Sequence, residues 1–458
     1  MLNRKGLHPT QVVAVAFTAT ILLGTALLML PAAAAPGKTT RFIDALFTAT
    51  SSVTVTGLGT VDTATQWSFF GHVVMAALME IGGFGIVSFA ILVGYLLEGR
   101  ISLKNKMTTS SEASVAVSTD IKALLRNITV MMLGFQTLLS AFLFIRFTTH
   151  YGYDWQKALG HSIFHSIASF NHAGFALYSD NLMGFATDGW ILIPIAATVL
   201  ISSLGFPVLA EIRDRAKLRF TKFRKKPAPF WMPAQWTLNS RIILWASLVL
   251  FLGGALGIGA LEWNNPGTLG PMGPADKVLN SAFASVMPRT VGFNSLDVGA
   301  MQPSTWLGTE ILMFIGGASA STSGGIKLGT AVVLFFIIYT EIRGEAAVNI
   351  GNRRLPRSMQ RQALTIVSIT AFVVIGSTML LSLTTKFNLD QILFEVVSAI
   401  GTVGLTTGIT GELPDHAKFL ICLVMLFGRL GPVVVATSLA LRRTTRHFEY
   451  PKESPLIG

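Results

Sequence analysis

Eight long apolar stretches, separated by more polar connections, set the pattern of hydrophobic and polar positions along this chain. Each stretch is close to or longer than the roughly 20 residues that a helix needs to cross about 30 Å of hydrocarbon. Only four charged side chains fall inside them, Glu80, Glu310, Lys327 and Arg429. The pattern therefore predicts an all-α integral membrane protein with eight transmembrane helices. The predicted spans are residues 11–30, 72–97, 127–145, 190–210, 242–261, 306–339, 363–383 and 419–441.

The composition agrees with a membrane protein and excludes several other classes. Charged residues make up 13% of the chain, against about 25% in soluble domains. A disordered, collagen-like or disulfide-rich chain is excluded, because apolar residues are abundant and there is a single cysteine. We expect Cys422 to be a small apolar packing residue, and no cysteines and histidines have the spacing of a zinc site.

The net charge of +12 follows from the predicted topology. With the N-terminus in the cytoplasm, 25 of the 35 Lys and Arg residues lie in the termini and loops on the cytoplasmic side. This distribution is typical of membrane proteins. We therefore expect a multi-pass protein of the cytoplasmic membrane with both termini inside and no nucleic-acid partner. The dense basic run at residues 213–226 is either a lipid-facing loop or a docking surface for a cytoplasmic partner.

Four short glycine motifs recur in the predicted outer connections, centred on Gly57, Gly174, Gly292 and Gly404. They are 117, 118 and 112 residues apart, and so regular a period indicates an internal repeat. Before each glycine lies a stretch too short to cross the membrane, which is typical of a re-entrant half-helix. These stretches are residues 45–53, 162–170, 280–287 and 392–400.

The chain is therefore predicted to hold four repeats of span, half-helix, glycine turn and span. Since two spans return the chain to the same side, the repeats are parallel and can surround one axis. A ring of backbone carbonyls on that axis can replace the water around a monovalent cation, provided that glycine allows a positive φ. The repeats predict a pseudo-fourfold pore with a selectivity filter. Their predicted limits are residues 1–110, 111–230, 231–350 and 351–458.

Over residues 11–441 the chain resembles the potassium-translocating subunits of the Trk/Ktr/HKT superfamily, and KtrB subunits most of all. The four glycine motifs and the run from Gly316 to Lys327 carry this resemblance. It implies potassium uptake through a pore of four two-span repeats, a homodimer, and a cytoplasmic ring of nucleotide-binding regulatory subunits. It implies K⁺ as the transported ion, with Na⁺ as a second candidate, and no covalently bound cofactor. Channel and symporter activity both stay open.

The resemblance also implies which residues line the filter. Each motif shares one glycine instead of the two in a T-V-G-Y-G channel, so we expect looser discrimination against sodium. His172 stands where the other repeats have Val55, Thr290 and Thr402. It is either a structural hydrogen-bonding group or a group that titrates near neutral pH and makes transport pH-sensitive. The predicted filter residues are Thr54, Val55, Thr56, Gly57, Asn171, His172, Ala173, Gly174, Thr290, Val291, Gly292, Gly401, Thr402, Val403 and Gly404.

The second span of the third repeat is predicted to break into a loop, because eight of residues 316–325 are Gly, Ser or Thr and such runs form helices poorly. This loop is the predicted gate. Arg429 should either face the pore or pair with a carboxylate such as Glu80. Lys327 should extend towards the cytoplasm. The predicted gate residues are Gly316, Gly317, Ser319, Ser321, Thr322, Ser323, Gly324, Gly325, Lys327 and Arg429.

Two further expectations concern residues near the filter. The glycine clusters at residues 82–85 and 204–207 in the first two repeats should allow helices to pack closely. Arg289, three residues before Gly292, should lie behind the filter and be held by a carboxylate such as Glu395.

Other functions fit the sequence less well. No enzyme is expected, because residues 36–40 lack the first glycine of a phosphate-binding loop and no paired carboxylates occur within the spans. The alternative is a secondary transporter for another small cation or solute that uses broken helices at mid-membrane. Inverted repeats of that kind require an odd number of spans per repeat, whereas each repeat here has two.

Overall fold

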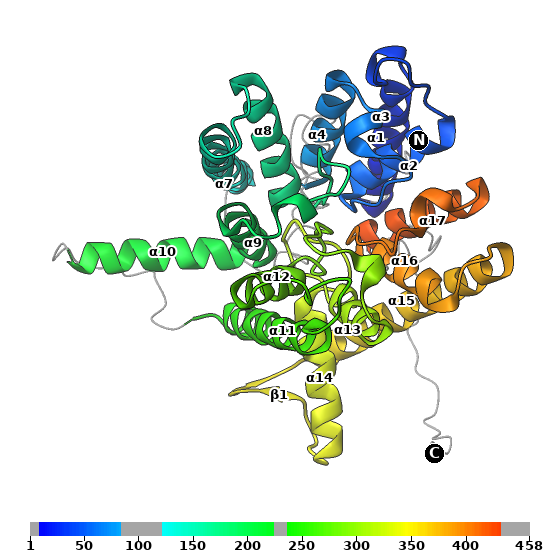
Figure 1. Ribbon diagram of the computed structural model, residues 1–458. Coiled ribbons are helices and arrows are strands. Elements are labelled where there is room, and N and C mark those ends of the chain that lie inside the picture. The colour runs from blue at the N-terminus through cyan, green and yellow to red at the C-terminus, as the bar shows by residue number, and fades with distance from the viewer. Residues whose placement is uncertain (1–8, 84–120, 224–235, 432–458) are drawn as a thin grey trace, which may run out of the picture.

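The computed structural model describes residues 9–83, 121–223 and 236–431, and most of these residues are helical (Figure 1). Successive parts of the chain follow one another around the centre of the view, so that α17 near the end lies beside α2 near the start. Within the described residues the strands are β1 (Asn349–Ile350) and β2 (Arg353–Arg354), which pair antiparallel. Two predicted spans continue into residues 84–97 and 432–441, which lie outside the described residues.

Four of the helices are long and apolar enough to cross a membrane unbroken, in the part of the chain that the structure describes. All four coincide with spans predicted from the sequence, and each begins one of the proposed repeats. They are α1 (Pro9–Leu28), α7 (Ile121–Thr149), α11 (Leu238–Glu262) and α15 (Arg357–Thr384).

A shorter helix follows each long one, and we call these four the half-helices. Helices are confirmed at all four predicted positions, although each begins earlier than the sequence suggested, α8 and α12 by the most. They are α2 (Phe42–Thr54), α8 (Trp155–Asn171), α12 (Pro274–Val286) and α16 (Leu389–Gly401). Short turns in the connections are η1 (Pro31–Ala33), α3 (Thr63–Gln66), η2 (Met183–Phe185), η3 (Val298–Ala300) and η4 (Ile409–Glu412).

The remaining helices correspond to the second predicted spans, and two of these spans are broken. The predicted break in the third is confirmed, because α13 (Pro303–Phe314) ends well before α14 (Leu328–Ile342) begins. The second span also breaks, between α9 (Gly189–Ser203) and α10 (Phe206–Phe223), which meet at 102°. We expected the cluster at residues 204–207 to serve packing alone, and that was wrong. The others are α4 (Phe69–Gly83) and α17 (Asp415–Leu430).

Buried polar contacts join the elements around the centre. Lys418 in α17 lies 3.5 Å from Asp44 in α2, and both side chains are buried, so an ion pair joins the last helix to the first half-helix. Within α11, the carboxylate of Glu262 is wholly buried. It accepts hydrogen bonds from Asn265 and Thr268 at 2.6 Å, from the backbone of Gln302 at 2.9 Å and from the Thr305 hydroxyl.

Replacing Glu262 by Ala should strongly destabilise the third proposed repeat, in which α11 is the first helix. Four donors that now share one carboxylate would be left buried without it, and each buried unsatisfied group costs about 1–3 kcal/mol. We expect the transition temperature of the variant, purified in detergent, to fall by several degrees. The measurement is size-exclusion chromatography after heating, in which the monodisperse peak disappears at a lower temperature. Glu341→Ala, on the exposed end of α14, is the matched control and should leave the transition unchanged. Equal stability of the two variants would contradict this account.

Candidate functional site

The same unusual backbone turn follows each half-helix, directly after α2, α8 and α16 and three residues after the C-cap Met287 of α12. The residue two positions before each motif glycine has a positive φ, with Val55 at 55°, His172 at 66°, Thr290 at 75° and Thr402 at 49°. The glycines themselves also have positive φ, from 64° at Gly174 to 96° at Gly404, as the sequence predicted. A left-handed residue commonly ends a helix, but it is usually glycine. Valine and threonine in this region are strained, and such strain clusters at functional sites.

The four turns, which we call glycine segments one to four (residues 54–57, 171–174, 289–292 and 401–404), form a closed ring. A Cβ built on Gly57 would lie 3.3 Å from the Cα of Gly174, and one on Gly404 would lie 3.0 Å from the Cα of Gly57. Gly174 and Gly292 contact the next segment in the same way. Each glycine also lies directly against a carbonyl oxygen of its neighbour. These carbonyls belong to Ala173, Val291, Val403 and Thr56 in turn.

The second helices approach the same turns through their glycines. A Cβ on Gly82 in α4 would overlap the carbonyl of Val53, and one on Gly428 in α17 would overlap that of Ile400. Val53 and Ile400 hold equivalent positions, four residues before the motif glycine. Gly82, in the cluster at residues 82–85, therefore allows close packing, as expected. It packs against the base of the first glycine segment.

The loop between α13 and α14, residues 315–327, lies against the helix-C-terminal side of the ring. Its two ends meet where Gly316 N–H donates to the Ile326 carbonyl at 2.8 Å. The Thr322 hydroxyl donates to the carbonyl of Phe170 at 3.0 Å, and a Cβ on Gly324 would overlap the side chain of Thr402. The predicted gate residues are thus brought together beneath segments two and four.

Arg429 fixes this loop to a neighbouring helix. Its buried guanidinium donates to the Thr322 carbonyl at 2.7 Å and to the carbonyl of Gly82 in α4. Glu80 is not its partner, because the Glu80 carboxylate accepts instead from Gln136 at 2.9 Å and Asn171 at 2.6 Å. The alternative of an Arg429–Glu80 pair is therefore wrong for the described residues.

The predicted extension of Lys327 towards the cytoplasm stays a prediction. Its ammonium donates to the carbonyl of Ser323 at 2.7 Å, within the loop. The reason is local: the loop has carbonyls without helical partners, and an ammonium at the start of α14 can satisfy one of them.

The expected pairing of Arg289 with Glu395 was also wrong. Arg289 is 1% exposed, and its guanidinium donates to the hydroxyl of Ser247 in α11 at 3.0 Å. Glu395 accepts from the hydroxyls of Thr406 and Thr410 instead, the latter at 3.0 Å. Both groups lie behind the ring, but the carboxylate is used by the connection that follows its own half-helix.

His172 is wholly buried at the base of segment two. Its Nδ1 lies 3.0 Å from the Thr290 hydroxyl and its Nε2 lies 2.7 Å from the Ser202 hydroxyl. Of the two alternatives from the sequence, these contacts favour the structural hydrogen-bonding group. The sequence did not reveal either partner, because Ser202 and Thr290 are distant along the chain.

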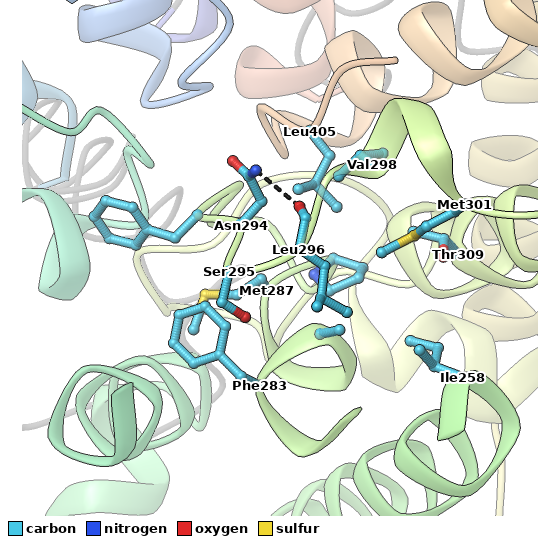
Figure 2. A pocket seen from close by; sticks show the side chains of 13 residues that line it. Ile258, Phe283, Met287, Asn294, Ser295, Leu296, Val298, Met301, Thr309 and Leu405 are labelled. Carbon is cyan, nitrogen blue, oxygen red and sulfur yellow. Dashed lines mark hydrogen bonds between the residues drawn. The ribbon is translucent and has the colours of Figure 1, made fainter. Parts of the chain in front are cut away.

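A pocket lies beside segment three (Figure 2). It is lined by side chains of α11, α12 and α13, such as Ile258, Phe283 and Thr309, and by the connection after Gly292. There the Asn294 amide donates to the Leu296 carbonyl at 2.9 Å. The lining is mostly apolar, and its polar side chains are Asn294, Ser295 and Thr309.

Long apolar helices arranged around a ring of closely packed backbone define a polytopic helical membrane protein with a central polar site. The profile of the TrkH family, described as cation transport protein, matches residues 4–445. The chain therefore belongs to the TrkH family of cation transport proteins, as the resemblance implied.

Individual relatives match nearly the whole chain. Ktr system potassium uptake protein B of Bacillus subtilis (strain 168) is 37% identical and is matched over 98% of this chain and 97% of its own length. The protein of the same name from Vibrio alginolyticus is 32% identical over 99% of this chain and 96% of its own length. Potassium/sodium uptake protein NtpJ of Enterococcus hirae is also 32% identical, over 99% of this chain and 98% of its own length.

A solved structure has the same fold. The crystal structure of the potassium transporter TrkH from Vibrio parahaemolyticus superimposes with a TM-score of 0.71, covering 96% of this chain and 86% of that one. The two sequences are 19% identical, so this likeness bears on the fold alone.

Proposed function

We propose that this protein takes up potassium ions across the cytoplasmic membrane, through a filter formed by the ring of glycine segments. The closed ring is the observation that carries the proposal. Four backbone turns meet at one place, and each turn brings carbonyl oxygens against the next. Rings of backbone carbonyls replace the hydration shell of potassium in selective pores, and irregular backbone at membrane depth is tolerated where it is buried in protein or lines a water-filled path.

The wider architecture of the proposal is that of four parallel repeats. Each would supply a span, a half-helix, a glycine segment and a second span, giving eight spans around a pseudo-fourfold pore. Both termini would lie in the cytoplasm. The order of the segments around the ring and the four long apolar helices support this arrangement.

The loop at residues 315–327 is the proposed gate. It lies on the side of the ring where the half-helices end, which is the cytoplasmic side in this topology. Hydrogen bonds from Thr322 and Arg429 hold it there. The Arg429 charge would also oppose a cation where water is sparse.

Regulation and sodium use form the remaining part of the proposal. We propose a homodimer that works with a cytoplasmic ring of nucleotide-binding subunits, and transport that depends on sodium. The names of the Ktr and NtpJ relatives support a potassium uptake system and a link to sodium respectively.

Uptake of rubidium or potassium by a transport-deficient bacterium tests the function directly. Cells that produce this protein should accumulate the ion, with and without a regulatory subunit, and sodium in the medium should increase the rate. If neither ion accumulates under any of these conditions although the protein is inserted in the membrane, the proposed function is wrong. Accumulation of another solute in its place would favour the alternative of a secondary transporter.

Replacing any one of Gly57, Gly174, Gly292 and Gly404 by Ser should impair ion selection. A side chain at these positive φ values costs about 1–3 kcal/mol and would displace the neighbouring carbonyl. We expect the apparent KM for potassium to rise about tenfold, or the preference for potassium over sodium to fall by a similar factor. The reason is that a loss of about 1.4 kcal/mol changes a binding constant tenfold. Rates are compared per inserted molecule. Gly376→Ser in α15, where an added Cβ meets nothing within 4 Å, is the matched control. Unchanged kinetics in all four variants would contradict the filter.

Deleting residues 317–324 should raise potassium flux and weaken its dependence on a regulator. The deletion can be bridged, because a Cβ on Gly325 would lie 3.8 Å from the Cα of Gly316. Thr322→Val, which removes only the hydroxyl bond to Phe170, should act in the same direction and more weakly. A deletion variant that inserts normally but conducts no faster than the parent would show that the loop is packing material.

Arg429→Ala should also raise flux while leaving ion preference unchanged, since the guanidinium lies below the ring and not in it. Arg429→Lys separates two causes. Lysine keeps the charge but cannot donate to both the Thr322 and Gly82 carbonyls in the same geometry. High flux in both variants would assign the effect to the lost hydrogen bonds, whereas parental flux in Arg429→Lys would assign it to charge. Unchanged flux in Arg429→Ala would remove Arg429 from the gate.

A further inference from the structure

The imidazole of His172 connects two glycine segments to a second-span helix. His172 and Thr290 occupy the same place in segments two and three, two residues before the glycine, and both have positive φ. Their side chains meet through the 3.0 Å contact between Nδ1 and Oγ1. On its other side the ring contacts Ser202 in α9 at 2.7 Å. Both contacts are buried, with His172 and Thr290 at 0% exposure and Ser202 at 2%.

Either neutral tautomer of this imidazole satisfies both contacts. One ring nitrogen donates and the other accepts, and the Thr290 and Ser202 hydroxyls take the complementary roles. A neutral imidazole therefore uses both ring nitrogens, and the hydrogen-bonded chain runs from segment three through segment two into α9.

The same pair of segments is also connected on the opposite side of the ring. The backbone of Leu182 donates to the carbonyl of Asn294 at 3.1 Å, and the backbone of Asn294 donates to the Asn181 side chain at 3.4 Å. The Asn181 amide lies 3.5 Å from the carbonyl of Gly174. The boundary between segments two and three is thus held both above and below the glycines.

Equivalent positions in the other segments lack such a connection. Val55 is apolar, and a Cβ on Gly82 would lie 2.7 Å from its Cγ2, so it makes a packing contact. The Thr402 hydroxyl is buried and has no hydrogen-bond partner among the described residues. His172 is therefore the side chain at this position that joins one segment to the next by hydrogen bonds on both ring nitrogens.

We propose that His172 is a positioning residue of the filter, which fixes the spacing of segments two and three and thereby sets the preference for potassium over sodium. The proposal rests on the proposed function. The carbonyls of Ala173 and Val291 follow directly after His172 and Thr290, so a change in this contact moves two of the four carbonyls of the ring. A ring whose width is larger or more variable discriminates less between potassium and sodium, which differ in size.

His172→Val is the primary test, because Val55 shows that valine can adopt the required backbone at the equivalent position. Ser202→Ala and Thr290→Val each remove one of the two hydrogen bonds with little change in volume. The measurement is rubidium uptake per inserted molecule at sodium concentrations above those that give full stimulation, where additional sodium competes with rubidium for the filter. We expect the ratio of the sodium inhibition constant to the rubidium KM to fall about fivefold in each variant, the effect of roughly one lost hydrogen bond.

A double-mutant cycle tests whether the two side chains act through one another. If they do, His172→Val combined with Thr290→Val should change the ratio no more than either variant alone. Ser203→Ala is the matched control, since the adjacent hydroxyl donates only to Leu200 in its own helix, and it should leave the ratio unchanged.

The outcomes separate this inference from the proposed function. No rubidium uptake by the parent would overturn the function itself. A parent that takes up rubidium with a preference over sodium, together with variants of equal preference, would overturn the role of His172 and leave the function standing. Variants that lose thermal stability or yield, but keep the parental ratio per inserted molecule, would also overturn it, because His172 would then support the fold and not selection.

Discussion

The structure depends on one constraint, the mutual contact of four glycine backbones. A Cβ atom at Gly57, Gly174, Gly292 or Gly404 would meet the backbone of the adjacent segment, so the ring closes only because these side chains are absent. Four turns can approach this closely only if each enters from its own half-helix and leaves at once. The same constraint applies at Gly82 and Gly428, where an added Cβ would overlap the carbonyls of Val53 and Ile400, so glycine lets the second helices reach the base of the ring.

The left-handed residues beneath the glycines show a second side of the same constraint. Glycine would satisfy the backbone at Val55, His172, Thr290 and Thr402 without strain, yet none of them is glycine. Their side chains are buried and contact the elements next to the ring. Val55 packs against Gly82, and Thr402 lies against Gly324. His172 forms hydrogen bonds with Thr290 and Ser202. The packing and hydrogen bonds made by these side chains offset the strain of about 1–3 kcal/mol per residue. The turn is therefore fixed by its side chains as well as by its backbone.

The sequence predicted the features that depend on local composition and failed for those that depend on distant partners. Half-helices, long apolar helices and the loop after α13 could be found from length, hydropathy and glycine content. The break after α9 was missed, although Gly205, with φ of 82°, and Pro207 mark it. We expected Arg289 to pair with Glu395 because a buried arginine is commonly paired with a carboxylate. In the structure Thr406 and Thr410, close in sequence, satisfy the carboxylate, and Ser247 satisfies the arginine. Positive φ at valine and threonine could not be predicted, because their own preferences oppose it.

The loop at residues 315–327 is held differently from the ring. Apolar burial of Ile315, Ala318 and Ile326 holds its two ends. Between them, Gly324 lies against Thr402, and hydrogen bonds hold the rest: Thr322 to Phe170, Arg429 to Thr322, and Lys327 to Ser323. A loop fixed by apolar packing loses that energy when it moves, because apolar surface meets water. A loop fixed by hydrogen bonds can exchange them for bonds to water at small net cost, since a typical bond contributes only about 1 kcal/mol. Movement of this loop would therefore require water on the same side of the ring. A hydrated cavity beneath the proposed filter would supply both the path for an ion and the means of releasing the loop.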